Sequence, residues 1–211
     1  NILVLSVTTP TLDSDIKLCS IAKRKNPEII TIAKGAHFDE FDKEGLTNFK
    51  DLDVVIRGET EPTIYEIAKG EKFKTIKGIS YRAGNKTIRN KERPFLEDLD
   101  RLPFPARHLL KNELYRFPDT NLPYALILSS RGCPGSCIFC LVGKVSGKQL
   151  RTRSAANIIK EIESCIKDYG IKTFFFRADT FTWNKNWVID FCEKLIKMDL
   201  KIRWGTNSRV N

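Results

Sequence analysis

The sequence of 211 residues is short of several features that would define its class at once. It has no apolar run near the roughly 18–20 residues that a membrane-spanning helix requires, no internal repeat and no low-complexity segment. It shows no secretory leader, because the apolar run at residues 2–7 lacks a basic flank and a small-residue cleavage site. A content of 41% hydrophobic and 29% charged residues instead indicates an ordinary folded protein of one large or two small domains.

Negative charge is the scarcer kind, since 26 acidic residues stand against 36 basic ones and give a net charge of +10. That balance permits attraction to nucleic acid, phosphates or an anionic membrane surface. The basic residues are scattered, however, and Lys23-Arg24-Lys25 is the longest basic run. The pattern therefore favours a solvated basic surface over a nucleic-acid-binding face.

The cysteines are few and unevenly placed. Three of them fall within eight residues, and the others stand singly in helix-like segments, so a disulfide framework is not favoured. We expect a reduced, cytoplasmic protein with one cluster of thiol ligands. The six are Cys19, Cys133, Cys137, Cys140, Cys165 and Cys192.

The first 70 residues alternate apolar strands with helical patterns. Strands are predicted at residues 2–7, 28–33 and 52–56, and helices at 14–24 and 62–68. Such alternation predicts parallel pairing in an α/β layer fold, with a partial Rossmann-like domain over residues 1–70. Residues 71–123 differ, because a hairpin around Ala83-Gly84-Asn85 is followed by five of the nine prolines. We expect a hairpin and a proline-rich linker there, with a domain boundary near residue 120.

Residues 124–211 return to the βα alternation. Strands are predicted at 124–128, 173–176 and 201–205, and helices at 155–168 and 187–198. Ser154 is the expected N-cap of the first helix and Gly170 the expected stop. Three βα strands are few for a complete barrel, and Asn1 already lies in a predicted strand. We therefore expect the chain to be the middle of a longer protein.

The strongest chemical signal is the segment from Arg131 to Cys140, with the spacing Cys133-x3-Cys137-x2-Cys140. Three thiolates on one tight loop can ligate three irons of a [4Fe–4S] cube and leave the fourth iron open, and iron–sulfur clusters require such soft ligands. Two alternatives remain. One is a zinc site that takes its fourth ligand from a distant part of the chain, and the other is a set of three buried cysteines with no ligand role.

This loop resembles the signature of the radical S-adenosylmethionine enzymes, Cys-x3-Cys-x-aromatic-Cys, with Phe139 as the aromatic residue. The resemblance implies a partial (βα)6 barrel that begins at residue 124. It also implies that the open iron chelates S-adenosylmethionine, and that one electron cleaves the sulfonium to give a 5′-deoxyadenosyl radical. Phe139 would lie beside the adenine, although simple packing of the ring is the alternative.

The same resemblance assigns a role to the residues after the predicted strand at 173–176. Family members place an acidic or polar residue there that helps to hold the amino group of S-adenosylmethionine, and Asp179 is the candidate. Ala178 replaces one acid that many relatives carry, and Asp179 could equally be a helix cap. Asn207 and Arg209, after the next strand, are further candidates.

The first 70 residues resemble the cobalamin-binding domain that precedes many barrels of this family. The matching segments are Ser6-Val7-Thr8-Thr9, Gly35-Ala36-His37 and Arg57-Gly58-Glu59-Thr60-Glu61. The resemblance implies that Ser6, Thr8 and Gly35 line a cleft for the corrinoid nucleotide tail, although Ala36 replaces a glycine of the family pattern. Residues 96–105 resemble the linker that joins the two domains in that family.

These resemblances together predict a cobalamin-dependent radical enzyme, and specifically a C-methyltransferase, whose cofactors are a [4Fe–4S] cluster, S-adenosylmethionine and cobalamin. Its expected partners are a small-molecule or lipid substrate and a reductant such as a ferredoxin or flavodoxin. A member that forms a ring, forms a carbon–carbon bond or catalyses another rearrangement without methylation is the close alternative. An iron–sulfur electron carrier or a zinc-binding interaction protein is the alternative of another class.

Overall fold

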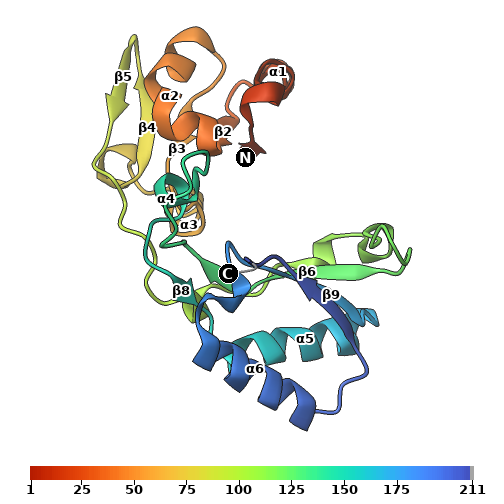
Figure 1. Ribbon diagram of the computed structural model, residues 1–211. Coiled ribbons are helices and arrows are strands. Elements are labelled where there is room, and N and C mark those ends of the chain that lie inside the picture. Colours follow the sequence, from red (N-terminus) through yellow and green to blue (C-terminus); the bar gives the residue numbers. More distant parts are fainter. Residues whose placement is uncertain (210–211) are drawn as a thin grey trace. The chain divides into compact units, whose positions relative to one another are not determined.

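The structure is a computed structural model, and it describes residues 1–209. The chain divides into two compact units, Asn1–Leu96 and Glu97–Asn211 (Figure 1). Each unit is an α/β fold with its own sheet and its own hydrophobic core. The partial Rossmann-like domain and the first βα units of a barrel, expected from the sequence, are both present.

The first unit is built on a five-stranded sheet of order β1-β2-β3-β4-β5. The first three strands are parallel, and the last two run antiparallel as a hairpin. Its strands are β1 (Ile2–Ser6), β2 (Ile30–Lys34), β3 (Val54–Ile56), β4 (Ile79–Ala83) and β5 (Lys86–Arg89). Its helices are α1 (Leu12–Lys25), α2 (Ala36–Asn48) and α3 (Glu61–Ala68), with 3-10 turns at η1 (Thr9–Thr11) and η2 (Phe73–Thr75).

The parallel strands of this sheet are buried on both faces, which explains their unbroken apolar sequence. Neighbouring residues of β2 point to opposite sides: Ala33 joins a core with Cys19 of α1 and Phe38 of α2, while Ile32 joins one with Ile67 of α3. The helices therefore cover both faces, and the loops that follow the parallel strands lie at the carboxyl edge of the sheet.

Two features of the first unit differ from the sequence expectation. Helix α2 was not expected, because Gly45 interrupts the amphipathic pattern of the segment. In the structure the helix is kinked at Phe41, whose dihedral angles are non-helical. The absence of a side chain at Gly45 leaves room for the ring of Phe38. The hairpin, expected in a linker, pairs with β3 through Ile56 and Ile79 and completes the sheet. This pairing joins segments that are far apart along the chain, so no local pattern specifies it.

The second unit contains a parallel sheet of order β10-β9-β6 and a two-stranded antiparallel pair. The strands are β6 (Tyr124–Leu128), β7 (Ser130–Arg131), β8 (Arg151–Thr152), β9 (Thr173–Arg177) and β10 (Arg203–Thr206). The helices are α4 (Val142–Val145), α5 (Ala155–Tyr169) and α6 (Lys185–Lys197). The 3-10 turns are η3 (Leu99–Arg101), η4 (Arg107–Leu109), η5 (Asn112–Leu114) and η6 (Phe181–Trp183).

Helices α5 and α6 cover one face of the parallel sheet (Figure 1). Helix α5 begins at the expected cap, since Ser154 accepts a hydrogen bond from the Asn157 amide, and ends at Gly170 with φ +66°. The core beneath is aromatic: Phe181 contacts the rings of Trp187 and Trp204 at centroid distances of 5.3 and 5.8 Å. Full burial of each large apolar side chain contributes roughly 1.5–3 kcal/mol.

The proline-rich segment after residue 97 packs within the second unit. Arg107 forms an ion pair of 2.7 Å with Glu161 of α5, and Arg153 pairs with the other carboxylate oxygen of Glu161 at 2.5 Å. All three side chains are nearly inaccessible to solvent, so the two cations offset the cost of burying the acid. The boundary between the units therefore lies near residue 96, whereas we expected it near residue 120.

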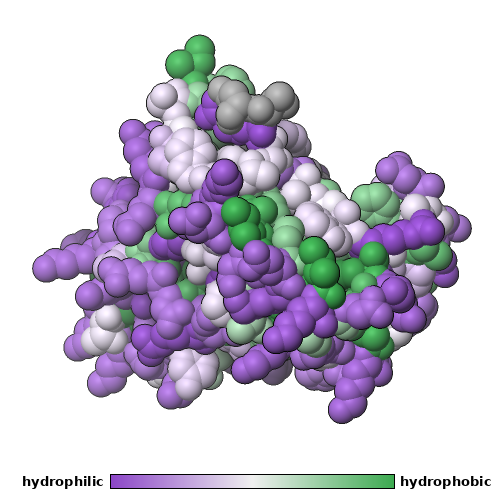
Figure 2. Space-filling view, turned by 60° about the horizontal axis from the view of Figure 1, so that its bottom comes forward, coloured by the Kyte–Doolittle hydropathy of each residue, from purple (hydrophilic) through white to green (hydrophobic). Residues whose placement is uncertain are grey.

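Charged and hydrophobic side chains are interspersed on the molecular surface. Figure 2 shows hydrophilic residues over most of one face, with the hydrophobic ones in small separate groups. Within residues 1–209, no helix combines the length and the apolar character needed to cross a membrane.

Candidate functional site

The candidate site lies where the loops leave the parallel strands of the second unit. Strands β6 and β9 pair in register up to Leu128 and Arg177, and the Ser129 amide donates to the Arg177 carbonyl oxygen at 2.9 Å. The cysteine loop and the segment that carries Asp179 therefore start side by side at one edge. Ligand sites in such sheets lie at this carboxyl edge.

The first cysteine is held through its backbone. Gly132 is buried with φ +87°, and a Cβ atom there would lie 2.2 Å from the Gln149 carbonyl oxygen, so only glycine fits. The Cys133 amide donates to the Gly147 carbonyl oxygen at 3.1 Å. The turn at residues 147–149 thus fixes where the cysteine loop begins.

Asp179 reaches the cysteine loop directly. Its Oδ2 accepts a hydrogen bond of 3.0 Å from the Gly132 amide. Asp179 is not the cap of the following helix. Helix α6 is capped by Asn184, whose side chain accepts a hydrogen bond from the Trp187 amide. The sequence identified Asp179 as a candidate but did not predict its contact with Gly132, because that contact depends on the register in which β6 and β9 pair.

Thr180 is a residue of the site that sequence reasoning missed. Its side chain is 3% exposed, and Oγ1 lies 3.7 Å from Cys133 Sγ. The same sulfur accepts a hydrogen bond of 3.4 Å from the Gly135 amide. A threonine that follows an acid at a strand end has no sequence signal of its own, because both strand geometry and turn geometry accept it.

The rest of the cysteine loop projects into solvent. Cys137 and Cys140 are exposed, as are Ile138 at 103% and Phe139 at 86%. The Cys140 amide donates to the Cys137 carbonyl oxygen at 3.1 Å, so these two thiols flank a turn. Two cysteines and the aromatic residue are therefore accessible to a bound group.

The two weaker candidates, Asn207 and Arg209, also lie near this edge. The carbonyl oxygen of Asn207 accepts from the Phe181 amide at 3.1 Å, which ties the end of β10 to the segment after β9. Arg209 Nη1 lies 3.3 Å from the position that a Cβ atom on Gly135 would occupy. Arg209 thus lies against the cysteine loop, while Asn207 contributes through its backbone.

The remaining cysteines belong to the packed interior. Cys19 and Cys165 are at most 1% exposed, and burial raises the pKa of each thiol to about 11. Cys192 is half-buried against the core of the second unit. A raised pKa disfavours the thiolate, which is the form that binds metals and reacts.

The donor set at the loop suits an iron–sulfur cube. Cys133, Cys137 and Cys140 are free thiols on one loop, and an amide hydrogen already points at the first sulfur. Within the part of the chain that the structure describes, no three His, Cys, Asp or Glu side chains are grouped as ligands of a single metal ion. A cube is bound differently, because each thiolate ligates a different iron.

The carboxyl edge of the first unit carries Ser6, Thr8 and Gly35. Ser6 and Thr8 are exposed, and the Thr8 hydroxyl bonds that of Thr11 at 2.8 Å. Gly35 has φ +130°, and a Cβ atom there would lie 2.1 Å from the Val7 carbonyl oxygen. The space beside Gly35 is thus filled by the backbone of Val7, the residue that follows β1.

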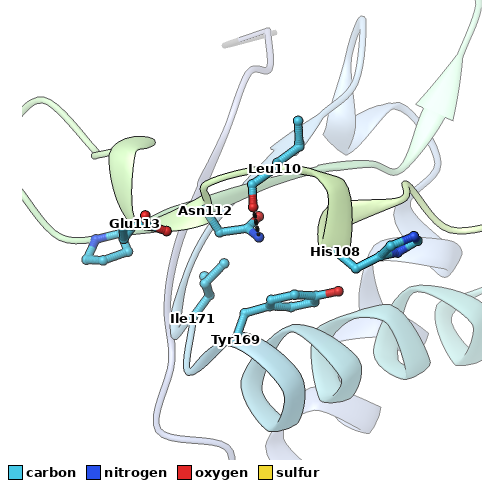
Figure 3. A pocket seen from close by; sticks show the side chains of 7 residues that line it. His108, Leu110, Asn112, Glu113, Tyr169 and Ile171 are labelled. Carbon is cyan, nitrogen blue, oxygen red and sulfur yellow. Dashed lines mark hydrogen bonds between the residues drawn. The ribbon is translucent and has the colours of Figure 1, made fainter.

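A hollow of about 250 Å³ occurs elsewhere in the second unit (Figure 3). Pro123, directly before β6, and Ile171, two residues before β9, place it at the amino-terminal end of the parallel strands. Figure 3 shows the side chain of Asn112 turned to the Leu110 carbonyl oxygen and the Tyr169 ring below it. This hollow is separate from the cysteine loop, which lies at the opposite edge.

No protein-family model matches the chain. Among curated proteins, it is 32% identical to an uncharacterized methyltransferase of Pyrococcus horikoshii, over the whole chain and 46% of that relative. It is 31% identical to the anaerobic magnesium-protoporphyrin IX monomethyl ester cyclase of Rubrivivax gelatinosus, over 96% of the chain and 38% of the relative. The chain thus spans less than half the length of these relatives.

Among solved structures, the fold matches the radical S-adenosylmethionine methyltransferase TsrM of Kitasatospora setae with cobalamin and a [4Fe–4S] cluster bound. The TM-score is 0.68 at 14% identity, over 96% of this chain and 43% of TsrM. At that identity the match shows the shared fold. With the relatives by sequence and the Cys-x3-Cys-x-aromatic-Cys loop, it makes the chain similar, over nearly its whole length, to the radical S-adenosylmethionine enzymes that carry a cobalamin-binding-type domain.

Proposed function

We propose that the protein is a radical S-adenosylmethionine enzyme and, more specifically, a cobalamin-dependent C-methyltransferase. The observation that carries this proposal is the loop of Cys133, Cys137 and Cys140, anchored at the carboxyl edge of parallel strands with two thiols exposed. When bound there, a [4Fe–4S] cluster supplies the electron that cleaves S-adenosylmethionine. The three thiolates would hold it, and the protein's task is to position the cofactors.

Two further residues would position S-adenosylmethionine. The ring of Phe139 is 86% exposed, so its face is available to an adenine. Asp179 would accept a charge-assisted hydrogen bond from the substrate ammonium group. A carboxylate has two oxygens, and the bond to the Gly132 amide uses Oδ2, so this role is compatible with the observed contact.

The first unit would bind the corrinoid at the carboxyl edge of β1, β2 and β3. The exposed hydroxyls of Ser6 and Thr8 support this proposal, because they can donate to a polar nucleotide tail. Gly35 would act indirectly, by letting the loop after β2 approach β1 closely. The substrate would be a small molecule or a lipid, and a ferredoxin or flavodoxin would deliver the electron.

A second candidate is a radical reaction without methyl transfer. It is supported by the cyclase of Rubrivivax gelatinosus, whose identity of 31% is nearly that of the methyltransferase relative. The two reactions differ in their products, since only methyl donation by S-adenosylmethionine releases S-adenosylhomocysteine. Reductive cleavage releases 5′-deoxyadenosine in both.

The test uses the full-length protein, reconstituted anaerobically with iron and sulfide and supplied with hydroxocobalamin. We expect absorption bands of both an iron–sulfur cluster and a corrinoid, and formation of 5′-deoxyadenosine from S-adenosylmethionine with dithionite as reductant. S-adenosylhomocysteine in addition would support the methyltransferase. A protein that binds zinc but no cluster, or a cluster that never cleaves S-adenosylmethionine, would contradict the proposal.

A further inference from the structure

Asp179 and Thr180 follow β9 and both contact the start of the cysteine loop. We propose that they are positioning residues for the cluster: Asp179 fixes the backbone before the first ligand, and Thr180 donates a hydrogen bond to the Cys133 sulfur and so raises the reduction potential. This inference rests on the proposed function, because it requires a cluster at the cysteine loop.

The segment that carries the two residues is rigidly supported. Ala178 and Phe181, which flank the pair, are 5% and 4% exposed and belong to the core of the second unit. The Phe181 amide also donates to the Asn207 carbonyl oxygen at 3.1 Å. Polar groups on such a support keep their direction when the loop opposite them moves, as a preorganised site requires.

Asp179 acts on the backbone of the loop. Its Oδ2 lies 3.0 Å from the amide nitrogen of Gly132, the residue before Cys133. The bond involves an ionised acceptor and is therefore stronger than one between neutral groups. With the Cys133 amide bonded to Gly147, it fixes the peptide unit from which the first thiolate projects.

Thr180 acts on the sulfur itself. As a metal ligand, Cys133 is deprotonated and accepts hydrogen bonds only. The Thr180 hydroxyl lies 3.7 Å from Sγ and donates to the Asp179 carbonyl oxygen at 2.8 Å. Because a hydroxyl hydrogen rotates to suit its surroundings, the thiolate and the carbonyl compete for it, and the charged acceptor forms the stronger bond.

The electrochemical consequence has a definite sign. Reduction adds negative charge to the cluster and its sulfur ligands, so a donor at Cys133 stabilises the reduced form more than the oxidised form. Hydrogen bonds to the sulfurs are among the factors that set cluster potentials. Burial of Thr180 strengthens the effect, because water does not screen the hydroxyl dipole.

The decisive experiment compares variants of the full-length protein, reconstituted anaerobically with a cluster. Thr180→Val removes the hydroxyl at nearly constant shape, Thr180→Ser keeps it, and Thr182→Val removes a neighbouring hydroxyl that bonds Ser208 instead. The readouts are the iron and sulfide content and the midpoint potential from a redox titration followed by electron paramagnetic resonance, without S-adenosylmethionine.

We expect Thr180→Val to retain the cluster with a more negative midpoint potential, while Thr180→Ser and Thr182→Val match the wild type. Thr180→Ala gives the same readout if valine proves too bulky against the sulfur. An unchanged potential in a cluster-loaded Thr180→Val protein would overturn this inference alone. A wild type that assembles no cluster would overturn the proposed function itself, and the inference with it.

The role of Asp179 is tested by iron retention in the presence of a chelator. Asp179→Asn keeps an oxygen acceptor for the Gly132 amide, whereas Asp179→Ala leaves that buried amide without its partner. We expect Asp179→Ala to lose iron about tenfold faster than the wild type, and Asp179→Asn, which keeps a neutral acceptor, to lie between the two. Equal rates for Asp179→Ala and the wild type would remove Asp179 from the proposed anchor.

Discussion

The two units carry their candidate loops at equivalent places, the carboxyl ends of parallel strands, and each loop has a glycine in close contact with a carbonyl oxygen, but the second loop is also held by polar side chains. In the first unit the backbone of the loop after β2 packs directly against the backbone of Val7, since there is no room for a side chain between Gly35 and the Val7 carbonyl oxygen. In the second unit Gly132 makes the same kind of close backbone contact, with the Gln149 carbonyl oxygen, and polar side chains are added to it, through Asp179 at Gly132 and Thr180 at Cys133. A backbone contact fixes shape, whereas a side-chain contact also sets electrostatic properties.

The difference agrees with what each edge is proposed to bind. A corrinoid tail requires room and a few polar groups, which close backbone packing and exposed hydroxyls provide. A redox cluster requires a defined charge environment, which hydrogen-bond donors near sulfur provide. Substitution at the close contact of Gly35 should therefore affect folding, whereas substitution of the exposed Ser6 or of Asp179 and Thr180 should affect ligand properties.

The largest expected effect is at the cysteine loop. Changing Cys133, Cys137 or Cys140 to alanine should abolish cluster retention, because each thiolate would ligate one iron of the cube. Cys165→Ala is the matched control, since this buried thiol lies in the core of the same unit. Iron and sulfide counts after anaerobic reconstitution give the answer. Equal iron loss in Cys165→Ala would contradict the division into ligand and core cysteines.

At the first edge, Gly35→Ala should destabilise the first unit by about 3 kcal/mol, since its Cβ atom would lie 2.1 Å from the Val7 carbonyl oxygen in a strained conformation. Gly70→Ala is the control: it also has a positive φ but meets no atom within 4 Å, so we expect about 1 kcal/mol. Urea unfolding measures both. If both variants lost the same free energy of unfolding, the close contact between Gly35 and Val7 would not contribute to stability.

Asp179→Ala should weaken S-adenosylmethionine binding to the cluster-loaded protein. Loss of a charge-assisted hydrogen bond to an ammonium group costs about 1.5–3 kcal/mol, or roughly 10- to 150-fold in affinity. Calorimetry on samples of matched iron content measures the change. If the affinity were unaltered, the proposed contact between Asp179 and S-adenosylmethionine would be wrong, and the role of Asp179 would be limited to its contact with Gly132.

The smallest expected effect is at Ser6, whose exposed side chain allows a larger residue without strain on the fold. Ser6→Phe should lower corrinoid affinity about tenfold by filling the proposed cleft, with an unchanged unfolding transition. Absorption spectroscopy after cobalamin loading, run beside denaturant unfolding, separates the two readouts. A variant that binds cobalamin as tightly as the wild type would place the corrinoid elsewhere.

Much of the fold could be predicted because local signals mark its elements. The apolar run at Tyr124–Leu128 forms β6, and Ser154 and Gly170 bound α5 as a cap and a left-handed stop. Helix α2 escaped prediction because its amphipathic pattern is broken by the kink at Phe41. The pairing of β3 with β4 escaped because it depends on tertiary contacts.

The candidate site divides in the same way. The spacing of the three cysteines singles them out from the sequence alone, because few other functions place thiols so close together. The contacts of Asp179 and Thr180 with the loop follow from the register in which Leu128 pairs with Arg177. Register is set by the packing of whole strands, and one sequence does not specify it locally.

The aromatic core around Phe181 has an optical consequence. All three tryptophans lie between residues 183 and 204, and two of them, Trp187 and Trp204, contact the Phe181 ring. The first unit contains tyrosines but no tryptophan. Fluorescence excited selectively at indole therefore reports on the second unit alone, beside the segment that carries Asp179 and Thr180. Emission spectra can thus follow the aromatic core behind Asp179 and Thr180 while circular dichroism follows both units, with no added label.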